Sequence, residues 1–304
     1  MSRAIEPPPQ TAPAAPAETP APREKNLLAR LSVGDWIIVG LLAALFGPMF
    51  KEMVDLWMQP EAPQAYALLV LPAALCLAWM LRSRLDALTP QPAAVGLIPI
   101  ALGLGLLFVG TLVKALTISA LGFVTVAAGV VLARYGRAIA RRLWFPLAYL
   151  LALVPIPHEQ LNMMTFPLQE LSIRWAGLLL KPFGEVRIEG TQMHLNDYTL
   201  NVIAPCSGLT IVLPIMVLAL YYLYIINAPF WKKAVLFGLT FPIAMLVNAI
   251  RVALIAIVGD LYGGRAADTF HDYSGMITVV LGFVALVFIA QEMRCNKIHD
   301  EIAL

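Results

Sequence analysis

Charged side chains are scarce in this chain, since Asp, Glu, Lys and Arg make up only 13% of its 304 residues. Hydrophobic residues account for 60%, which excludes an ordinary soluble domain and is typical of a multi-span membrane protein. The net charge of +2 gives no indication of nucleic-acid binding, and no basic patch with interleaved aromatic residues is found. The composition therefore predicts contact with membrane lipid and gives no reason to expect nucleic acid as a partner.

Cysteine is also scarce. Three scattered cysteines are too few for a disulfide framework or a zinc site, and the sequence gives no sign of another metal or of a cofactor. Cys76 lies within an apolar run and is interpreted as a small core residue, whereas Cys295 lies in a polar C-terminal tail. Only Cys206 stands among turn-forming residues, where a thiol can meet a substrate.

The beginning of the chain differs in composition from the rest. Residues 1 to about 26 are rich in Pro and Ala, a composition that cannot bury a core and predicts disorder. No small-residue cleavage site follows, so a removable signal peptide is not expected. We expect a disordered cytoplasmic tail over 1–30, a transmembrane domain over 31–292 and a second cytoplasmic tail over 293–304.

The rest of the chain contains long apolar runs. A helix that spans a bilayer needs about 17–25 residues, and the candidates are 33–50, 65–81, 93–112, 115–133, 143–157, 209–226, 234–258 and 274–291. The fifth run is short for a span, and Pro155 and Pro157 end it. The predicted fold class is an all-α polytopic membrane protein with about eight transmembrane helices.

The basic residues of the connections support this count. With a cytoplasmic N-terminus every short inside loop is basic, as the positive-inside rule requires; the inside pairs include Arg82/Arg84, Arg141/Arg142 and Lys232/Lys233. Dropping the weak fifth run would place Lys232 and Lys233 outside. Both chain ends are therefore expected inside.

One long connection, about 158–205, lies outside in this topology. Apolar residues recur in it at three- and four-residue spacing: Leu161, Met164, Leu168, Leu171, Trp175 and Leu178. This pattern predicts an amphipathic helix, which either lies on the outer membrane surface or packs on the protein's own spans. Strict alternation over 185–190 and turn signals at Gly190 and Asn196-Asp197 then predict a small β-hairpin or three-stranded element between spans five and six.

Three reactive residue types fall at one level of the predicted membrane. Cys206 lies just before the sixth span, His271 just before the eighth, and Arg251 within the seventh, about 10–12 Å below its outer end at 1.5 Å rise per residue. A charged residue within a span is a functional candidate by default, because its burial costs about 2.5–3.5 kcal/mol. A lone cysteine near a helix end is more often structural. The functional interpretation of Cys206 therefore depends on its occurrence at the same level as Arg251 and His271.

The three residue types suit a cysteine acyl-transfer site. Cys206 is the candidate nucleophile, since a helix N-terminus and a nearby cation favour its thiolate. His271 is the candidate general acid and base, and Arg251 offers fixed donors to an oxyanion.

Neighbouring residues are candidates for supporting roles. Asn248, one helical turn before Arg251, is expected to orient it or to bind the substrate backbone. Ser207 is interpreted as a helix cap, and Asp272 or Asp268 as a group that orients the His271 ring. His158 and His194 compete with His271 for the role of base, and His194 is the stronger rival.

Three segments carry a resemblance to a known family: Ala-Pro-Cys-Ser-Gly-Leu over 204–209, Asn-Ala-Ile-Arg-Val over 248–252 and Phe-His-Asp-Tyr-Ser-Gly over 270–275. In this order, with apolar helices between them, they resemble the exosortase/archaeosortase family, the membrane transpeptidase-like proteases of PEP-CTERM-type sorting systems. The resemblance covers about 155–290. It implies the catalytic triad Cys206, Arg251 and His271, with no metal or cofactor.

The resemblance also implies substrates and a location. The substrates are exported proteins with a C-terminal sorting signal, made of a short motif, a hydrophobic span and a basic end. Cleavage before that span gives a thioester acyl-enzyme, which an unknown acyl acceptor resolves. The site then faces the outside or periplasm from a prokaryotic cytoplasmic (inner) membrane. Two alternatives remain at this point: a transporter with Arg251 as a substrate site, and a non-enzymatic assembly factor for surface polysaccharide.

Overall fold

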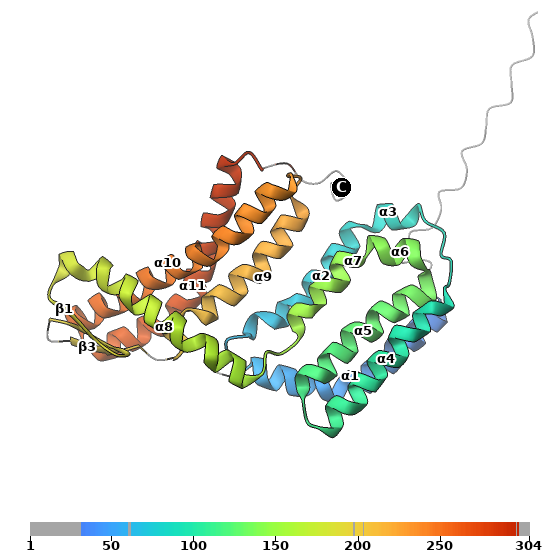
Figure 1. Ribbon diagram of the computed structural model, residues 1–304, viewed down its shortest axis with the longest axis horizontal. Coiled ribbons are helices and arrows are strands. Elements are labelled where there is room, and N and C mark those ends of the chain that lie inside the picture. Colours follow the sequence, from blue (N-terminus) through green and yellow to red (C-terminus); the bar gives the residue numbers. More distant parts are fainter. Residues whose placement is uncertain (1–31, 60–61, 197, 203, 296, 298–304) are drawn as a thin grey trace, which may run out of the picture.

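The computed structural model describes residues 32–59, 62–196, 198–202, 204–295 and 297 (Figure 1). The tail expected over 1–30 lies outside these residues, as does most of the tail expected over 293–304. The described residues form α-helices and one small sheet. The helices are α1 (Val33–Trp57), α2 (Val70–Met80), α3 (Arg82–Asp86), α4 (Leu97–Leu112), α5 (Leu116–Tyr135), α6 (Arg137–Arg142), α7 (Trp144–Tyr149), α8 (His158–Leu180), α9 (Leu209–Ile225), α10 (Phe230–Tyr262) and α11 (Gly264–Glu292). The strands are β1 (Val186–Glu189), β2 (Gln192–Leu195) and β3 (Tyr198–Asn201).

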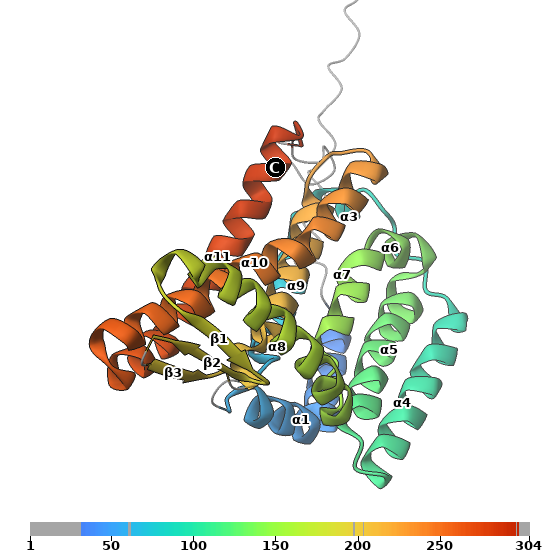
Figure 2. The same ribbon diagram turned by 60° about the vertical axis from the view of Figure 1, so that its left-hand side comes forward.

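The helices form two groups, as Figure 1 shows. The first group contains α1 to α7 and the second contains α9, α10 and α11, while α8 crosses from the first group to the second. Aromatic side chains join the groups, since the ring of Phe145 on α7 stacks on that of Tyr224 on α9 at a centroid distance of 4.0 Å. The sheet lies at the end of the second group, beside α8 and α10 (Figure 2).

Each expected span corresponds to an apolar helical segment. Five segments among the described residues are long and apolar enough to cross a membrane: Val33–Trp57, Ala94–Leu112, Leu116–Tyr135, Phe230–Tyr262 and Gly264–Glu292. Three shorter apolar segments coincide with the second, fifth and sixth expected spans: Ala65–Met80, Trp144–Leu153 and Leu209–Ile225. The all-α polytopic class is confirmed, and the count of eight spans stays a prediction.

Glycines let α4 and α5 pack with their backbones in close approach. A Cβ atom on Gly103 would lie 2.6 Å from the carbonyl oxygen of Gly122, and one on Gly122 would lie 2.7 Å from the carbonyl oxygen of Gly103. Van der Waals packing through small residues is the main attraction between helices in a membrane, where lipid is as apolar as the side chains. The glycines of α4, which carry no side chain, thus allow the backbone of α5 to pack directly against it.

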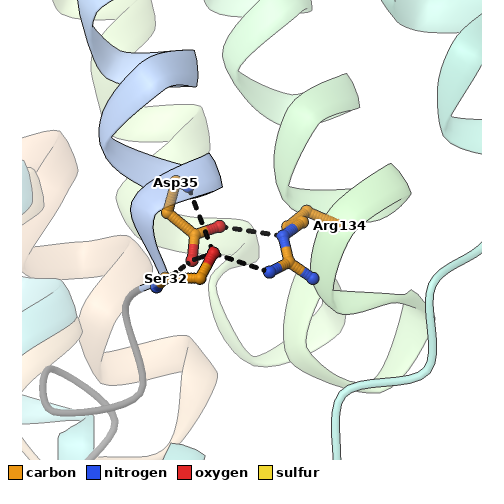
Figure 3. Close-up of polar contacts among 3 residues, drawn as sticks. All are labelled: Ser32, Asp35 and Arg134. Atoms are coloured by element: carbon orange, nitrogen blue, oxygen red, sulfur yellow. Dashed lines mark hydrogen bonds and ion pairs between the residues drawn. The ribbon is translucent and has the colours of Figure 1, made fainter.

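A polar cluster fastens the start of α1 to the end of α5 (Figure 3). Ser32 and Asp35 form a reciprocal capping box, and the guanidinium of Arg134 donates from Nε to Asp35 Oδ1 at 2.8 Å and from Nη2 to Ser32 Oγ at 3.1 Å. Asp35 is buried, so its charge depends on this partner. The cluster holds the first helix in register with the fifth.

The long connection forms the expected helix, and this helix packs on the protein itself. The buried side of α8 includes Gln169, Ser172, Ile173, Ala176 and Leu180, and it lies against α10 and the sheet. Of the apolar stripe that the sequence suggested, Leu161 is buried, but Met164 and Leu178 are exposed. The predicted apolar stripe is therefore only partly buried, and the polar residues Gln169 and Ser172 lie on the buried side of the helix instead.

The β element is a three-stranded antiparallel sheet in the order β1-β2-β3. Its two turns contain Gly190 and Asn196, both with positive φ, as the turn signals predicted. Met193, Leu195 and Val202 are buried in a cluster with side chains of α8 and α10. Beyond it, the ring of Tyr198 packs on Gly259 of α10, where a Cβ would overlap the ring.

Two glycines of α4 offer a matched test of the α4–α5 contact. Gly103→Ala is expected to destabilise the protein by about 1–3 kcal/mol, because its Cβ meets backbone that cannot yield without separating the helices. Gly105, two residues away, faces open space, so Gly105→Ala is expected to be neutral or slightly stabilising. Thermal unfolding of both variants in detergent micelles measures the difference. Equal melting temperatures would show that the backbone approach does not matter for stability.

Candidate active site

Cys206 lies in a short 3-10 turn, Ala204–Ser207, that leads into α9. It is 3% exposed and packs in the cluster that contains Ile173 of α8 and Val252 of α10. Gly208 follows with φ of +92°, a conformation that favours glycine, and a Cβ there would lie 3.0 Å from Asn248 Nδ2. The chain thus turns sharply between the thiol and the first residue of α9.

Side chains from two helices hold this turn by its carbonyl groups. Ser172 Oγ donates to the carbonyl oxygen of Ser207 at 3.0 Å, and Asn248 Nδ2 donates to the carbonyl oxygen of Cys206 at 3.2 Å. Asn248 Nδ2 also donates to Ser172 Oγ at 2.9 Å, so the donors form one connected network. A further bond runs from Gln169 Nε2 to the carbonyl oxygen of Val202. The network is buried, which makes each of its bonds costly to lose.

Arg251 lies on α10, one helical turn after Asn248, and is 5% exposed. Its Nε donates to Ser274 Oγ at 2.9 Å, and its Nη2 donates to the carbonyl oxygen of His271 at 3.1 Å. Both partners belong to α11, so the guanidinium links the last two helices. A buried guanidinium needs such partners, because desolvation of its charge is expensive.

His271 lies inside α11 and not ahead of it. The helix begins at Gly264, ten residues before the span that the sequence suggested, so the prediction that His271 precedes the helix is wrong. Its side chain is 14% exposed, and Nδ1 lies 3.4 Å from Oδ1 of the exposed Asp272. That separation is close enough for a weak orienting contact, as expected for Asp272.

One turn of α10 connects the three candidate residues. Asn248, at its start, holds the carbonyl of Cys206, and Arg251, at its end, holds the carbonyl of His271. These contacts join the backbone of the Cys206 turn and of the His271 segment to one turn of α10, and the convergence of the three side chains on one reaction centre stays a prediction. Asn248 contacts the Cys206 turn, while Ser274 and His271 hold Arg251, so the expectation that Asn248 orients Arg251 is replaced by another role. Ser207 Oγ accepts from the backbone N–H of Leu209 at 3.3 Å, but the N-cap of α9 is Gly208, so Ser207 lies one residue before the expected cap position.

The two rival histidines lie elsewhere. His158 is the exposed first residue of α8. His194 lies on β2, where its Nδ1 is 2.9 Å from Thr199 Oγ1 on the neighbouring strand. Arg251 contacts the backbone of His271, and so the geometry associates His271 most closely with the buried cation.

The comparison with known families gives one result that decides the family. The family model described as transmembrane exosortase matches residues 57–288, a range that holds all three candidate residues and most of the chain. The chain belongs to the transmembrane exosortase family. Searches of curated proteins and of solved structures gave no match. The exosortase is thus a multi-pass membrane protein of a family of sorting transpeptidases that act on exported proteins.

A large apolar cavity of about 740 Å³ lies between the two helix groups of the exosortase. Arg251, His271, Asp272 and Gly275 line it at one place, and its other lining residues include Tyr66, Tyr149, Val217 and Tyr221. Along α9 the lining runs from Thr210 to Tyr221, which corresponds to about 16 Å at 1.5 Å per residue. We refer to it as the inter-group cavity.

A second cavity, of about 710 Å³, lies beside the start of α9. It is lined by Ser207 and Leu209 and by residues of the first helix group, among them Trp57 and Lys114. Both cavities include Ala62 and Thr210 in their lining. The two cavities therefore approach each other at the start of α9, and Cys206 itself is in the lining of neither. Within the described residues, no group of three or more His, Cys, Asp or Glu side chains could hold a metal ion.

The network around Cys206 includes two residues that sequence reasoning did not assign to the site. Gln169 and Ser172 are polar residues three positions apart on the buried side of α8. Their spacing was the available signal, because a polar pair on one face of an otherwise apolar helix needs partners. Ser274 was missed as well, although it lies one turn after His271, on the same face of α11.

The hydroxyl of Ser172 gives a test of the network. Ser172→Ala removes a bond to Ser207 and leaves Asn248 with one partner fewer, so we expect a loss of about 1–3 kcal/mol and a changed alkylation rate of Cys206. Thr240→Val is the control, since Thr240 is equally buried and donates to Leu236 of its own helix. Thermal unfolding and mass spectrometry of the Cys206 peptide after N-ethylmaleimide treatment measure both effects. Identical behaviour of the two variants would exclude a special role for Ser172.

Proposed function

We propose that this exosortase is a membrane-embedded cysteine protease/transpeptidase that cleaves the C-terminal sorting signals of exported proteins through a thioester on Cys206. The observation that carries the proposal is the single turn of α10 on which Asn248 holds the Cys206 carbonyl and Arg251 holds His271. These contacts link the backbones of three distant segments, and this supports a site in which Cys206 is the nucleophile, His271 the proton carrier and Arg251 the fixed cation.

The reaction starts from a thiolate on Cys206 and a protonated His271. The thiolate attacks the carbonyl carbon of the scissile peptide bond, and Arg251 donates to the oxyanion that forms. His271 gives its proton to the departing amine as the C–N bond breaks, which leaves a thioester on Cys206. The acceptor, an amine or water, then loses a proton to His271 as it attacks the thioester, and the thiolate is restored.

The supporting residues keep these groups in place. Asn248 and Ser172 hold the carbonyls of Cys206 and of Ser207, the residue after it, and Ser207 Oγ accepts from the first backbone N–H of α9. Asp272 lies beside the imidazole of His271, with Oδ1 3.4 Å from Nδ1, and orients the ring. No step requires a metal or an organic cofactor.

The inter-group cavity suits the hydrophobic span of the sorting signal. It has a mainly apolar lining, and Arg251 and His271 are part of that lining. A substrate held there places its apolar span between the helix groups and its scissile bond beside the buried cation. With a cytoplasmic N-terminus, this level lies toward the outer face of a prokaryotic cytoplasmic membrane.

Removal of the thiol tests the proposal. Host cells with Cys206→Ala are expected to accumulate exported proteins that keep a hydrophobic, basic-ended tail, whereas wild-type cells cleave it. Arg251→Lys is expected to lower kcat by about 10²–10³-fold, the loss typical of an oxyanion donor. Mass spectrometry of C-terminal peptides records the cut, and an added mass identifies the acyl acceptor. Cells with Cys76→Ala serve as control, and unchanged processing in Cys206→Ala would refute the proposal.

Gly275 tests the role of the inter-group cavity. A Cβ at this position meets only ordinary contacts, 3.7 Å from Arg251 Nη2, so Gly275→Phe is expected to fold and to fill the cavity beside the site. Overpacking against a bound span costs about 1–3 kcal/mol, which corresponds to about tenfold or more in kcat/KM. Val284→Phe, on the exposed side of the same helix, is the control. Kinetics that do not distinguish the two variants would place the substrate span elsewhere.

A further inference from the structure

The sheet of this exosortase has a free edge that leads directly to the candidate nucleophile. Among the described residues β3 pairs with β2 only, and four residues separate its end at Asn201 from Cys206. Figures 1 and 2 show β3 at the side of the sheet that is farther from α8. A free strand edge offers unpaired backbone donors and acceptors to another extended chain.

The register identifies which backbone groups face this edge. The N–H of Val202 donates to the carbonyl oxygen of Thr191 at 2.9 Å, so these two residues form a hydrogen-bonded pair. Hydrogen-bonded and non-hydrogen-bonded pairs alternate along an antiparallel ladder. The pairs Gln192–Asn201 and His194–Thr199 are therefore non-hydrogen-bonded, and the backbone N–H and C=O groups of Thr199 and Asn201 point away from β2.

The side chains of β3 leave these groups accessible. Tyr198 and Leu200 face α10, where Tyr198 packs on Gly259 and Leu200 packs on the cluster around Cys206. Thr199 and Asn201 lie on the opposite face and are exposed. The helix thus covers one face of the strand and not its edge.

The start of β3 lies near α11 as well as α10. Tyr198 is close to Asp268 of α11, and burial together with this carboxylate raises the pKa of the tyrosine. His271 follows Asp268 by three residues, one turn along the same helix. The start of β3 therefore lies near the segment of α11 that leads to His271, and its end leads to the Cys206 turn.

We propose that the free edge of β3 binds the substrate segment just before the cleaved bond, as an added extended strand. The inference rests on the proposed function and names its peptide-recognition surface. The occupant is the exported polypeptide itself, because the strand ends at the nucleophile and the cavity beyond Arg251 takes the apolar side of the cut. Backbone pairing supplies binding that tolerates many side chains, and alternate side chains of the substrate meet Thr199 and Asn201 on the exposed face of β3.

The pairing predicts an alternating requirement for substrate N–H groups. Synthetic sorting-signal peptides, N-methylated at one residue at a time over the four residues before the cut, are incubated with the full chain in lipid nanodiscs. Methylation at every second residue is expected to lower kcat/KM by about tenfold, since it removes one backbone hydrogen bond. Methylation at the residues between is expected to have little effect. A profile without alternation overturns the proposal.

A variant of the strand gives an independent readout. Asn201→Pro removes an N–H that faces the edge, and proline is tolerated at such edge positions, whereas Asn201→Ala keeps the N–H. We expect Asn201→Pro alone to raise KM by about tenfold, with kcat and the melting temperature close to those of Asn201→Ala. Equal KM values for the two variants contradict the pairing.

The outcomes separate the two proposals. Peptide cleavage that persists in Cys206→Ala removes the proposed function, whatever the methylation profile shows. Loss of cleavage in Cys206→Ala, combined with a flat methylation profile, removes only the strand pairing. The methylation series uses the wild-type chain, so it decides the question even if Asn201→Pro does not fold.

Discussion

The guanidinium of Arg251 is the group on which the arrangement of the last three helices depends. It is almost completely buried among apolar helices, and its charge is stabilised there through Ser274 and the carbonyl of His271. Because both partners are on α11, the ion fixes the distance and register between α10 and α11. Asn248, a turn away on the same helix, extends this constraint to the Cys206 turn. One buried charge thus aligns three segments that are far apart in sequence.

Around this centre the molecule divides the tasks of substrate recognition between two environments. The inter-group cavity is an apolar space between helices, and it suits a segment that comes from lipid. The sheet carries polar backbone groups and exposed polar side chains, and it suits a segment that comes from water. The thiol is buried just before α9, in a cluster with side chains of the sheet, α8 and α10. In the proposed function, the boundary between apolar and polar substrate residues sets the place of the cut.

Much of this architecture follows from the sequence, because the apolar runs and the residues Cys206, Arg251 and His271 need little tertiary information to be recognised. The residues at which α10 ends and α11 begins cannot be predicted from the sequence in the same way. Charged residues such as Asp260 and Asp268 suggest a loop between two spans, but both helices continue through them. The reason is tertiary: Asn196 donates to Asp260 at 2.9 Å, and Tyr198 packs on Gly259, so the sheet covers helix ends that leave the apolar region. Gln169 and Ser172 were missed for a similar reason. Their hydrogen-bond partners are the carbonyl groups of Val202 and Ser207, which only the tertiary fold brings next to α8.

The burial of Cys206 has a consequence for chemical inhibition. A thiol that is 3% exposed and packed among aliphatic side chains is shielded from water-borne electrophiles and oxidants. The large space nearest to the buried cation is apolar and lies between membrane helices. In the proposed function, covalent inhibitors directed at Cys206 therefore need to dissolve in the bilayer first, and lipophilic electrophiles with a short polar head are expected to outperform water-soluble ones of greater intrinsic reactivity.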